Sequence, residues 1–570
     1  MQSPGREGSL TGSPSRPDRR WIAWAVAAGC VAALLRLLLY DDGFWIDEVQ
    51  SVDTADRPVG GLLTQTGLAD VHPPLYYLTL KLWRFLFGES DAAARCLSIL
   101  FGAGTVSLFV AWARKQLTPA ALSVATLLIV VSTFHVHYSV EVRSYAMLTF
   151  LALALAWALS RWVDRPPDRP GRALAAVLVI EIALALTHYY GLLVILAVQP
   201  YIFAHQGLSA ARVRRWAAGQ AVVLGAIAWW IPLLLVQMLD LPAGFTAHLA
   251  EGPSVADLFA AWGPASALEP HLVAVAAGVL VVGIAAWGAF IREAETPLEA
   301  SKGTSARRMM ALAALLLVIG PVLALGLLPL SETTFDVVAN RVLPTYVVEV
   351  VVVLTLLGAV WAHQRLRVRL RLPLAFWIVV VPLVVVGVMQ LFKPTLSIRN
   401  LLFTLPFVAA LLGRRVNTWP RWAAVAVGSV ILGLAVPSQL AMPEGFSPRA
   451  DYRGVSAQIR EMHPKAEPPI AMLSRFDVGA LAHYSADCSL NGTYRFRCAC
   501  AADGRCGRRI VGVSDLQAVT TRGRPPFLLL LTREAAMGAE ATATAVKKAF
   551  PKARVEQHAF RGLVLLDVAR

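Results

Sequence analysis

The chain contains 570 residues, of which 57% are hydrophobic and only 16% charged, and its mean hydropathy is +0.59. A soluble globular protein is closer to half apolar and a quarter charged, so this composition indicates an integral membrane protein. The net charge of +15 would suggest nucleic-acid binding in a soluble protein. Here Lys and Arg collect in short loops between apolar runs, which is typical of cytoplasmic loops, and no nucleic-acid partner is expected.

Residues 1–20 are rich in Pro, Ser, Gly and Arg and are predicted to form a disordered cytoplasmic tail. The apolar run at 21–40 is long enough to span a membrane, and no small-residue cleavage site follows it. This run is therefore predicted to be the first membrane helix rather than a signal peptide.

Apolar runs of about spanning length recur to residue 440 and predict an α-helical polytopic domain, 21–440, with about thirteen transmembrane helices. The predicted helices are 21–40, 95–112, 119–134, 145–162, 172–187, 190–205, 216–237, 271–291, 309–329, 345–362, 373–391, 400–413 and 422–440. The apolar stretch 75–87 is shorter and carries Lys81 and Arg84, so it is expected to lie at the membrane surface.

The loop charges predict how the bundle is oriented. With the basic tail in the cytoplasm, every second loop is cytoplasmic, and these loops carry clusters of Lys and Arg residues. The opposite loops gather acids, histidines and a few cations: Asp47, Glu48, His72, His135, His137, Glu141, Arg143, His188, Tyr189, Asp336, Asn340, Arg341, Lys393 and Arg399. This asymmetry predicts a functional site at the outer face.

Residues 441–570 alternate short apolar runs with polar stretches and predict a small extracytoplasmic α/β domain. Four cysteines lie close together in this domain: Cys488, Cys498, Cys500 and Cys506. In an oxidising compartment they favour disulfides of undetermined pairing, with a metal knot as the alternative. Cys30 and Cys96 lie in or beside helices and are expected to be inert.

The first outer loop carries Asp47 and Glu48, which follow Phe44 and Trp45 just beyond the first helix. An exposed loop can contain acids without using them, but ionisable residues crowded at a membrane boundary are functional candidates. A carboxylate here could take a proton from an acceptor hydroxyl or hold a divalent cation. The segment after Val49 could form a helix lying on the membrane.

His72 opens the surface stretch, and the following Pro73 and Pro74 stiffen its entry. A lone histidine is more often a surface residue than a ligand. Beside two acids on the same loop, His72 becomes a candidate for contacting the substrate or a metal.

The second outer loop alternates Glu141 and Arg143, which could be ordinary polar filling between two helices. Arginine nevertheless suits phosphate, because its guanidinium offers paired donors in a planar fork. Arg399 has the same opportunity in the last outer loop, and Arg341 is a weaker third candidate.

Several of these segments together resemble the GT-C glycosyltransferases, in particular the protein O-mannosyltransferase-like group that includes the lipid A aminoarabinose transferases. The resemblance covers residues 21 to 460 and lies in the acid pair, in the His72–Tyr77 segment and in the Tyr138–Tyr145 segment. Two further segments match with one substitution each: Arg399–Leu402 with Pro406, where Asn400 replaces Tyr, and Asp451–Gly454, where Tyr452 replaces Trp.

The resemblance implies a polyprenyl-phosphate-linked hexose or pentose donor, transfer on the outer face, and Asp47 as the base. Metal dependence occurs in parts of the family, so a divalent cation is a possible cofactor here. The implied setting is a bacterial plasma membrane, with membrane lipids around the protein and a lipid, glycan or protein as acceptor.

A sugar on a polyprenyl phosphate already has a good leaving group, so the reaction needs a base for the acceptor and cations for the departing phosphate. A single displacement would invert the anomeric carbon. The hypothesised roles are Asp47 as base; Glu48 and Glu141 as positioning or metal-binding acids; Arg143, Arg399 and Arg341 as phosphate partners; and His72, Glu141, Tyr145 and His188 as substrate or metal contacts.

The main alternative is a polytopic transporter or lipid flippase with an extracytoplasmic domain. Such proteins usually place ionisable residues near the bilayer midplane and often contain internal repeats. Here the helical acids Glu181 and Glu349 lie toward the outer ends, and no repeat is evident. A non-catalytic membrane assembly protein is a third possibility, but it leaves the acid-rich first loop unexplained.

Overall fold

The computed structural model describes residues 20–38, 43–68, 70, 72–164, 171–204, 210–240, 373–392, 397–440, 451–463, 470–472, 481, 488–489, 509–512, 526–532, 539–560 and 563–569. In the first half the helices are α1 Arg20–Leu38, α2 Ile46–Asp56, α3 Val59–Leu68, α4 Leu75–Phe87, α5 Asp91–Ala113, α6 Pro119–Val131, α7 Thr133–Val140, α8 Tyr145–Val163, α9 Gly171–Thr187, α10 Tyr190–Ala204, α11 Ala210–Ile227 and α12 Ile231–Asp240. The later helices are α18 Leu374–Phe392, the 3-10 helix η3 Ile398–Thr404, α19 Leu405–Val416, α20 Arg421–Leu440, α22 Tyr452–Met462 and α26 Ala539–Ala549.

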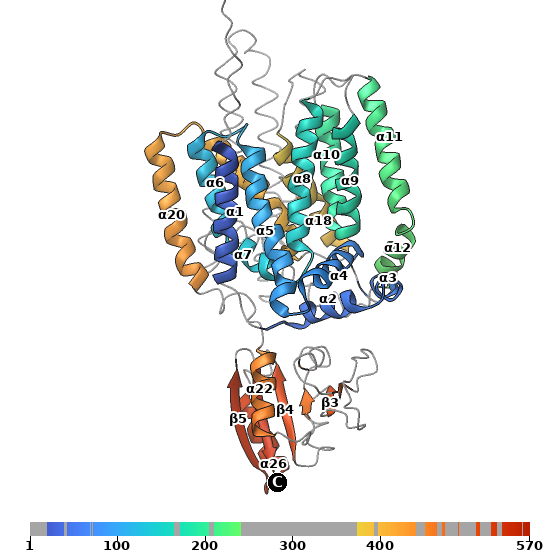
Figure 1. The fold of residues 1–570 in the computed structure, drawn as a ribbon. Coiled ribbons are helices and arrows are strands. Elements are labelled where there is room, and N and C mark those ends of the chain that lie inside the picture. The colour runs from blue at the N-terminus through green and yellow to red at the C-terminus, as the bar shows by residue number, and fades with distance from the viewer. Residues whose placement is uncertain are drawn as a thin grey trace, which may run out of the picture.

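The long apolar helices run side by side as a bundle (Figure 1). Among the described residues, α1, α5 and α8 are long and apolar enough to cross a membrane, and α6 with α7 forms a fourth candidate span bent by 51°. The predicted helical membrane protein is therefore confirmed. The tail up to residue 19 and the predicted helices 271–291, 309–329 and 345–362 lie outside the described residues, so the total of thirteen stays a prediction.

Two predicted spans differ in detail from the structure. The run 216–237 is divided between α11 and α12, and Pro232 lies in the first turn of α12, where its missing N–H costs no helical hydrogen bond. The run 400–413 begins earlier, as η3, and continues as α19 with Pro406 in the first turn.

The segment from His135 to Tyr138 is helical rather than an outer loop, which corrects the sequence prediction. It belongs to α7, and the Ser132 side chain begins this helix by accepting the His135 backbone N–H at 3.2 Å. A Cβ added to Gly102 of α5 would lie 2.3 Å from the Ser139 hydroxyl, so the glycine lets α7 approach α5 closely. The apparent loop is thus packed inside the bundle.

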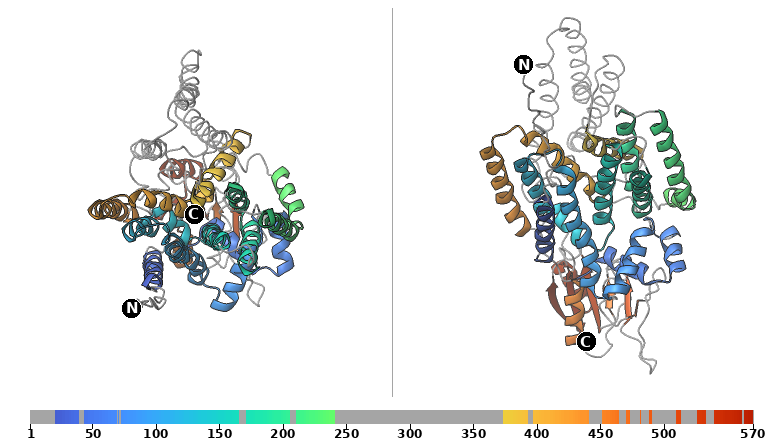
Figure 2. Two further views of the ribbon diagram at one scale, coloured as in Figure 1. Left: turned by 90° about the horizontal axis from the view of Figure 1, so that it is seen from above. Right: turned by 45° about the horizontal axis from the view of Figure 1, so that its top comes forward.

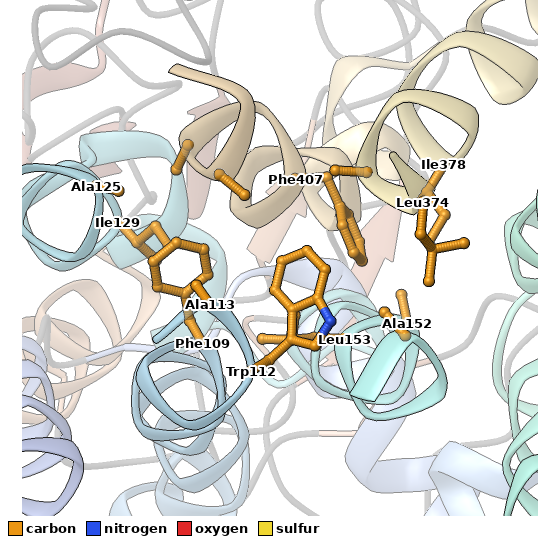
Figure 3. Packing of buried hydrophobic residues seen from close by; sticks show 14 of the residues in the cluster. Phe109, Trp112, Ala113, Ala125, Ile129, Ala152, Leu153, Leu374, Ile378 and Phe407 are labelled. Carbon is orange, nitrogen blue, oxygen red and sulfur yellow. The ribbon is translucent and has the colours of Figure 1, made fainter. Parts of the chain in front are cut away.

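Aromatic packing joins helices that are far apart in the sequence. The rings of Trp112 in α5 and Phe407 in α19 meet edge to face, with centroids 5.6 Å apart. Figure 3 shows this pair beside Leu153 of α8 and Leu374 and Ile378 of α18. The early and late parts of the chain therefore share one buried core.

The short helices α2, α3 and α4 lie at one end of the bundle, between it and the sheet domain (Figure 1). The stretch expected at the membrane surface is α4, with the predicted bounds 75–87. Its two cations hold it to α2: Lys81 donates to the carbonyls of Ala55 and Arg57 at 3.1 and 2.9 Å, and Arg84 pairs with Asp56 at 3.0 Å. These charges are used for packing within this end of the protein.

The C-terminal part contains six described strands in the order β2-β3-β1-β4-β6-β5. Their bounds are β1 Ile470–Met472, β2 Cys488–Ser489, β3 Arg509–Gly512, β4 Phe527–Thr532, β5 Arg554–Phe560 and β6 Leu563–Ala569. The first four pair in parallel, whereas β6 pairs antiparallel with β4 and β5. The predicted α/β character is confirmed; the side chains of the four clustered cysteines lie outside the described residues.

Strands β4 and β6 are buried on both faces, as the uninterrupted apolar run of β4 predicts. Leu529 and Leu531 pack with α26, while Leu528 and Leu530 pack with α22. The cluster on the α22 face continues into buried residues of α2, α4 and α5, and Arg453 of α22 forms an ion pair with Asp91 in the first turn of α5. The sheet domain therefore packs on the end of the bundle that carries α2 and α4, as Figure 1 and the right view of Figure 2 show.

A buried ion pair holds the start of α2 against α5. Arg95 donates from Nε and Nη2 to the two carboxylate oxygens of Glu48 at 3.0 and 2.7 Å, and both side chains are fully buried. The backbone N–H groups of Trp45 and Val142 donate to the same carboxylate at 3.2 and 3.0 Å. Arg95 also donates to the Gly43 carbonyl. A carboxylate offers about four lone-pair sites, so Glu48 is saturated.

We expect Arg95→Met to destabilise the protein by about 3–5 kcal/mol, because it leaves the buried Glu48 carboxylate without its cation. The thermal unfolding midpoint of purified protein in detergent measures this. The control is Arg57→Met, which removes an exposed pair with Asp53 at the end of α2, the helix that carries Glu48, and should change little. Equal midpoints for the two variants would show that the buried pair is dispensable.

Candidate active site

Asp47 lies in the first turn of α2, next to the saturated Glu48. Successive side chains of a helix point about 100° apart, so the two neighbouring acids face different partners. The Oδ2 atom of Asp47 lies 3.4 Å from Nη1 of Arg399, which is 352 positions later in the chain. The two side chains are 23% and 29% exposed, so a ligand can reach this pair.

Two arginines share one aromatic ring. The guanidinium carbons of Arg399 and Arg143 lie 5.7 and 6.0 Å from the ring centroid of Tyr145. Tyr145 is buried at the start of α8 and packs against Phe134 and Leu402. Because a cation over an aromatic face is attracted to it, the ring of Tyr145 helps to position both guanidinium groups.

Arg143 is also tied to α2 and to the loop before α4. Its Nη1 donates to the Ser51 hydroxyl at 3.4 Å, and its Nη2 lies 3.3 Å from Nε2 of His72. The Ser51 hydroxyl in turn donates to the Asp47 carbonyl at 2.9 Å. The backbone of Asp47 and the guanidinium of Arg143 are thereby positioned relative to each other.

His72 lies between Arg143 and an acid. Its Nδ1 is 2.9 Å from Asp70 Oδ1, and the hydroxyl of Tyr77 donates to Asp70 Oδ2 at 2.7 Å. Burial, followed by the charge of Arg143, lowers the pKa of His72, and the contact with Asp70 offsets this only in part. His72 is therefore a neutral ring at pH 7.

His188 and Glu141 border the same group. The ring of His188 stands edge-on to His72 with centroids 5.2 Å apart, and burial lowers the pKa of His188 well below the usual value. Glu141 is buried and its Oε1 accepts the indole N–H of Trp45 at 2.9 Å. Glu141 thus helps to fix the residue from which α2 begins.

The candidate metal ligands Glu48, His72 and Glu141 do not form a metal site in the described part of the chain. All four acceptor positions of Glu48 are filled, both ring nitrogens of His72 have partners, and Glu141 accepts from Trp45. No group of three or more His, Cys, Asp or Glu side chains among the described residues could hold a metal. These three residues therefore make contacts within the protein, and the divalent cation expected as a possible cofactor stays a prediction.

The structure brings together most of the residues singled out from the sequence, from five separate segments: Asp47, His72, Arg143, Tyr145, His188 and Arg399. Arg341 lies outside the described residues. The sequence reasoning missed Asp70, Ser51 and Arg95. Asp70 could have been noticed because it precedes His72 by two positions, and Arg95 because it is a cation inside an apolar run.

Comparisons with known proteins give one family match and several structural similarities. Residues 71–234 match the model of the dolichyl-phosphate-mannose-protein mannosyltransferase family. Among curated proteins none matches the chain.

The structural similarities are to proteins of 13–14% sequence identity. Apo ArnT from Cupriavidus metallidurans aligns over 95% of this chain and 97% of its own, at 13% identity and TM-score 0.46. The same enzyme bound to undecaprenyl phosphate aligns over 96% and 98%, at 14% identity and TM-score 0.39. The Archaeoglobus fulgidus oligosaccharyltransferase, solved with Zn and sulfate, aligns over 96% of this chain and 72% of its own, at 13% identity and TM-score 0.43.

The matched residues include His72, Glu141, Arg143, Tyr145 and His188, so the family match covers three of the segments that build the site. This match agrees with the predicted resemblance, and over residues 71–234 the chain is similar to the dolichyl-phosphate-mannose-protein mannosyltransferases.

Proposed function

We propose that this chain is a multi-pass membrane glycosyltransferase of the GT-C type, which moves a sugar from a polyprenyl-phosphate-linked donor to an acceptor hydroxyl with Asp47 as the base. Transfer takes place at the outer face of the cell membrane, where α2, α4 and the extracytoplasmic domain 441–570 meet. The reaction inverts the anomeric carbon.

The observation that carries this proposal is the convergence of one accessible carboxylate and two arginines. Asp47, Arg399 and Arg143 come from three separate segments and meet around the ring of Tyr145. A guanidinium carries five N–H donors, so Arg399 can contact Asp47 and a phosphate oxygen at the same time. A base beside an anion site is what the transfer of a sugar from a lipid phosphate requires.

The electron and proton movements balance without further reagents. The Asp47 carboxylate takes the proton of the acceptor hydroxyl, whose oxygen forms a bond to the anomeric carbon. The bond between that carbon and the phosphate oxygen breaks, and its electron pair leaves with the polyprenyl phosphate. The phosphate changes from one negative charge to two, and Arg399 and Arg143 stabilise this developing charge. One displacement gives inversion.

The remaining candidate residues position these groups. Glu48 anchors the first turn of α2 through Arg95, so that Asp47 is presented by a rigid backbone. Tyr145 holds the two guanidinium groups, and Glu141 holds Trp45. His72 and His188 form a neutral wall beside Arg143 and can contact the sugar or the phosphate.

Asp47→Asn should lower sugar transfer by about 10²–10⁴-fold, because it removes the base and leaves the fold intact. The assay follows release of labelled sugar from a panel of polyprenyl-phosphate sugars in membranes that contain the variant. Asp53→Asn, on the exposed side of the same helix, is the matched control and should retain wild-type transfer. Full activity of Asp47→Asn would remove Asp47 from the role of base.

Arg399→Gln should lower kcat/KM for the donor by about 10²–10³-fold, as expected for the loss of one transition-state charge partner. The same donor assay with purified protein measures this. Lys115→Gln, an exposed cation loosely paired with Asp164, serves as control. A variant with unchanged kcat/KM would exclude Arg399 from the anion site.

The same purified protein, reconstituted in vesicles, separates this proposal from a transporter or flippase. A glycosyltransferase cleaves the bond between the sugar and the phosphate of the donor and passes the sugar to an acceptor hydroxyl or to water. Movement of an intact labelled donor across the bilayer, with no cleavage, would instead favour the transporter.

A further inference from the structure

A line of buried hydrogen bonds runs from Tyr77 to Arg143. The Tyr77 hydroxyl donates to Asp70, the second oxygen of Asp70 lies 2.9 Å from Nδ1 of His72, and Nε2 of His72 lies 3.3 Å from Nη2 of Arg143. Asp70, Tyr77 and Arg143 are buried, with exposures of 6%, 2% and 5%. The line ends at one of the two guanidinium groups of the anion site.

The chemistry of the partners sets the direction of each hydrogen bond. A carboxylate only accepts, so Nδ1 of His72 must carry the ring proton that it donates to Asp70. In a neutral ring the other nitrogen then bears a lone pair, and Nε2 accepts an N–H from Arg143. The opposite tautomer would turn an N–H of His72 toward an N–H of the guanidinium and push Arg143 away.

The surroundings keep Asp70 in the ionised form that this arrangement needs. Burial by itself raises the pKa of the carboxyl, but the hydrogen bond from His72, the charge of Arg143 and the hydrogen bond from Tyr77 lower it to about 2. The backbone also fixes Asp70, whose N–H donates to the Gln65 carbonyl at 3.0 Å. Asp70 is thus an ionised hydrogen-bond acceptor at neutral pH, and its backbone position is fixed by the hydrogen bond to Gln65.

We propose that Asp70 is a positioning residue of the donor site: by holding His72 with its proton on Nδ1, it aims the Arg143 guanidinium at the lipid phosphate. The inference rests on the proposed function, since it assigns Arg143 to the phosphate. Asp70 acts through His72 and does not itself touch the substrate. A general rule supports this form of control, because the acid behind a histidine selects the tautomer that the histidine presents.

The test measures binding of undecaprenyl phosphate, the lipid product of such a transfer, to purified protein in detergent. We expect Asp70→Asn to raise the Kd on the order of tenfold, as for loss of one charged hydrogen-bond partner. The amide can donate to Nδ1 and so stabilise the wrong tautomer. Asp53→Asn is the matched control for the loss of one acid on the same end of the bundle.

A double-mutant cycle separates positioning from a general structural role. In a His72→Gln background, Asp70→Asn should add less than about twofold to the Kd, because Asp70 then has no histidine to orient. A fully additive effect, or an unchanged Kd for Asp70→Asn in a folded protein, overturns the inference. If Asp70→Asn gives no folded protein, Tyr77→Phe carries the test: a Kd raised several-fold supports the inference, and an unchanged Kd overturns it.

Failure of the proposed function has a different signature. A wild-type protein that does not bind undecaprenyl phosphate, or whose Arg399→Gln and Arg143→Gln variants bind it as well as the wild type, contradicts the anion site itself. Intact binding by the wild type with no effect of Asp70 contradicts only the positioning role.

Discussion

The buried ion pair of Glu48 and Arg95 is the constraint on which the rest of the site depends. Two unpaired charges inside a protein are costly, but here the carboxylate receives two N–H groups from Arg95 and two from the backbone. One of those backbone groups belongs to Val142, so the same carboxylate joins the start of α2, the first turn of α5 and the loop after α7. The segments that carry Asp47 and Arg143 are therefore held in a common frame.

The first turn of α5 also contacts the C-terminal domain through an ion pair. Asp91 pairs with Arg453 at the start of α22, four positions before Arg95 pairs with Glu48. The apolar cluster that underlies the sheet continues beneath α2 and α4. Four positions of α5 thus separate the contact with the sheet domain from the ion pair that fixes the start of α2.

Adjacent acids serve different purposes because a helix turns between them. In the sequence, Asp47 and Glu48 are adjacent acids, and both are candidates for the catalytic site. In the structure Glu48 points into the protein and is saturated by donors, whereas Asp47 is partly exposed and meets a cation from the far end of the chain. The two ring nitrogens of His72 are likewise in contact with protein groups, at Asp70 and at Arg143.

The sequence alone determined the membrane class, the extents of α1, α4 and α8, the α/β character of the last part and the list of ionisable residues on one side, because hydropathy and periodicity are local properties. It also pointed to Arg399 and Arg143 as anion partners. It did not predict the helical path of His135 to Tyr138, which depends on a close contact between Gly102 and Ser139, or the roles of Asp70 and Arg95. Those depend on contacts between segments distant in the chain, and only tertiary packing decides which buried charge finds which partner.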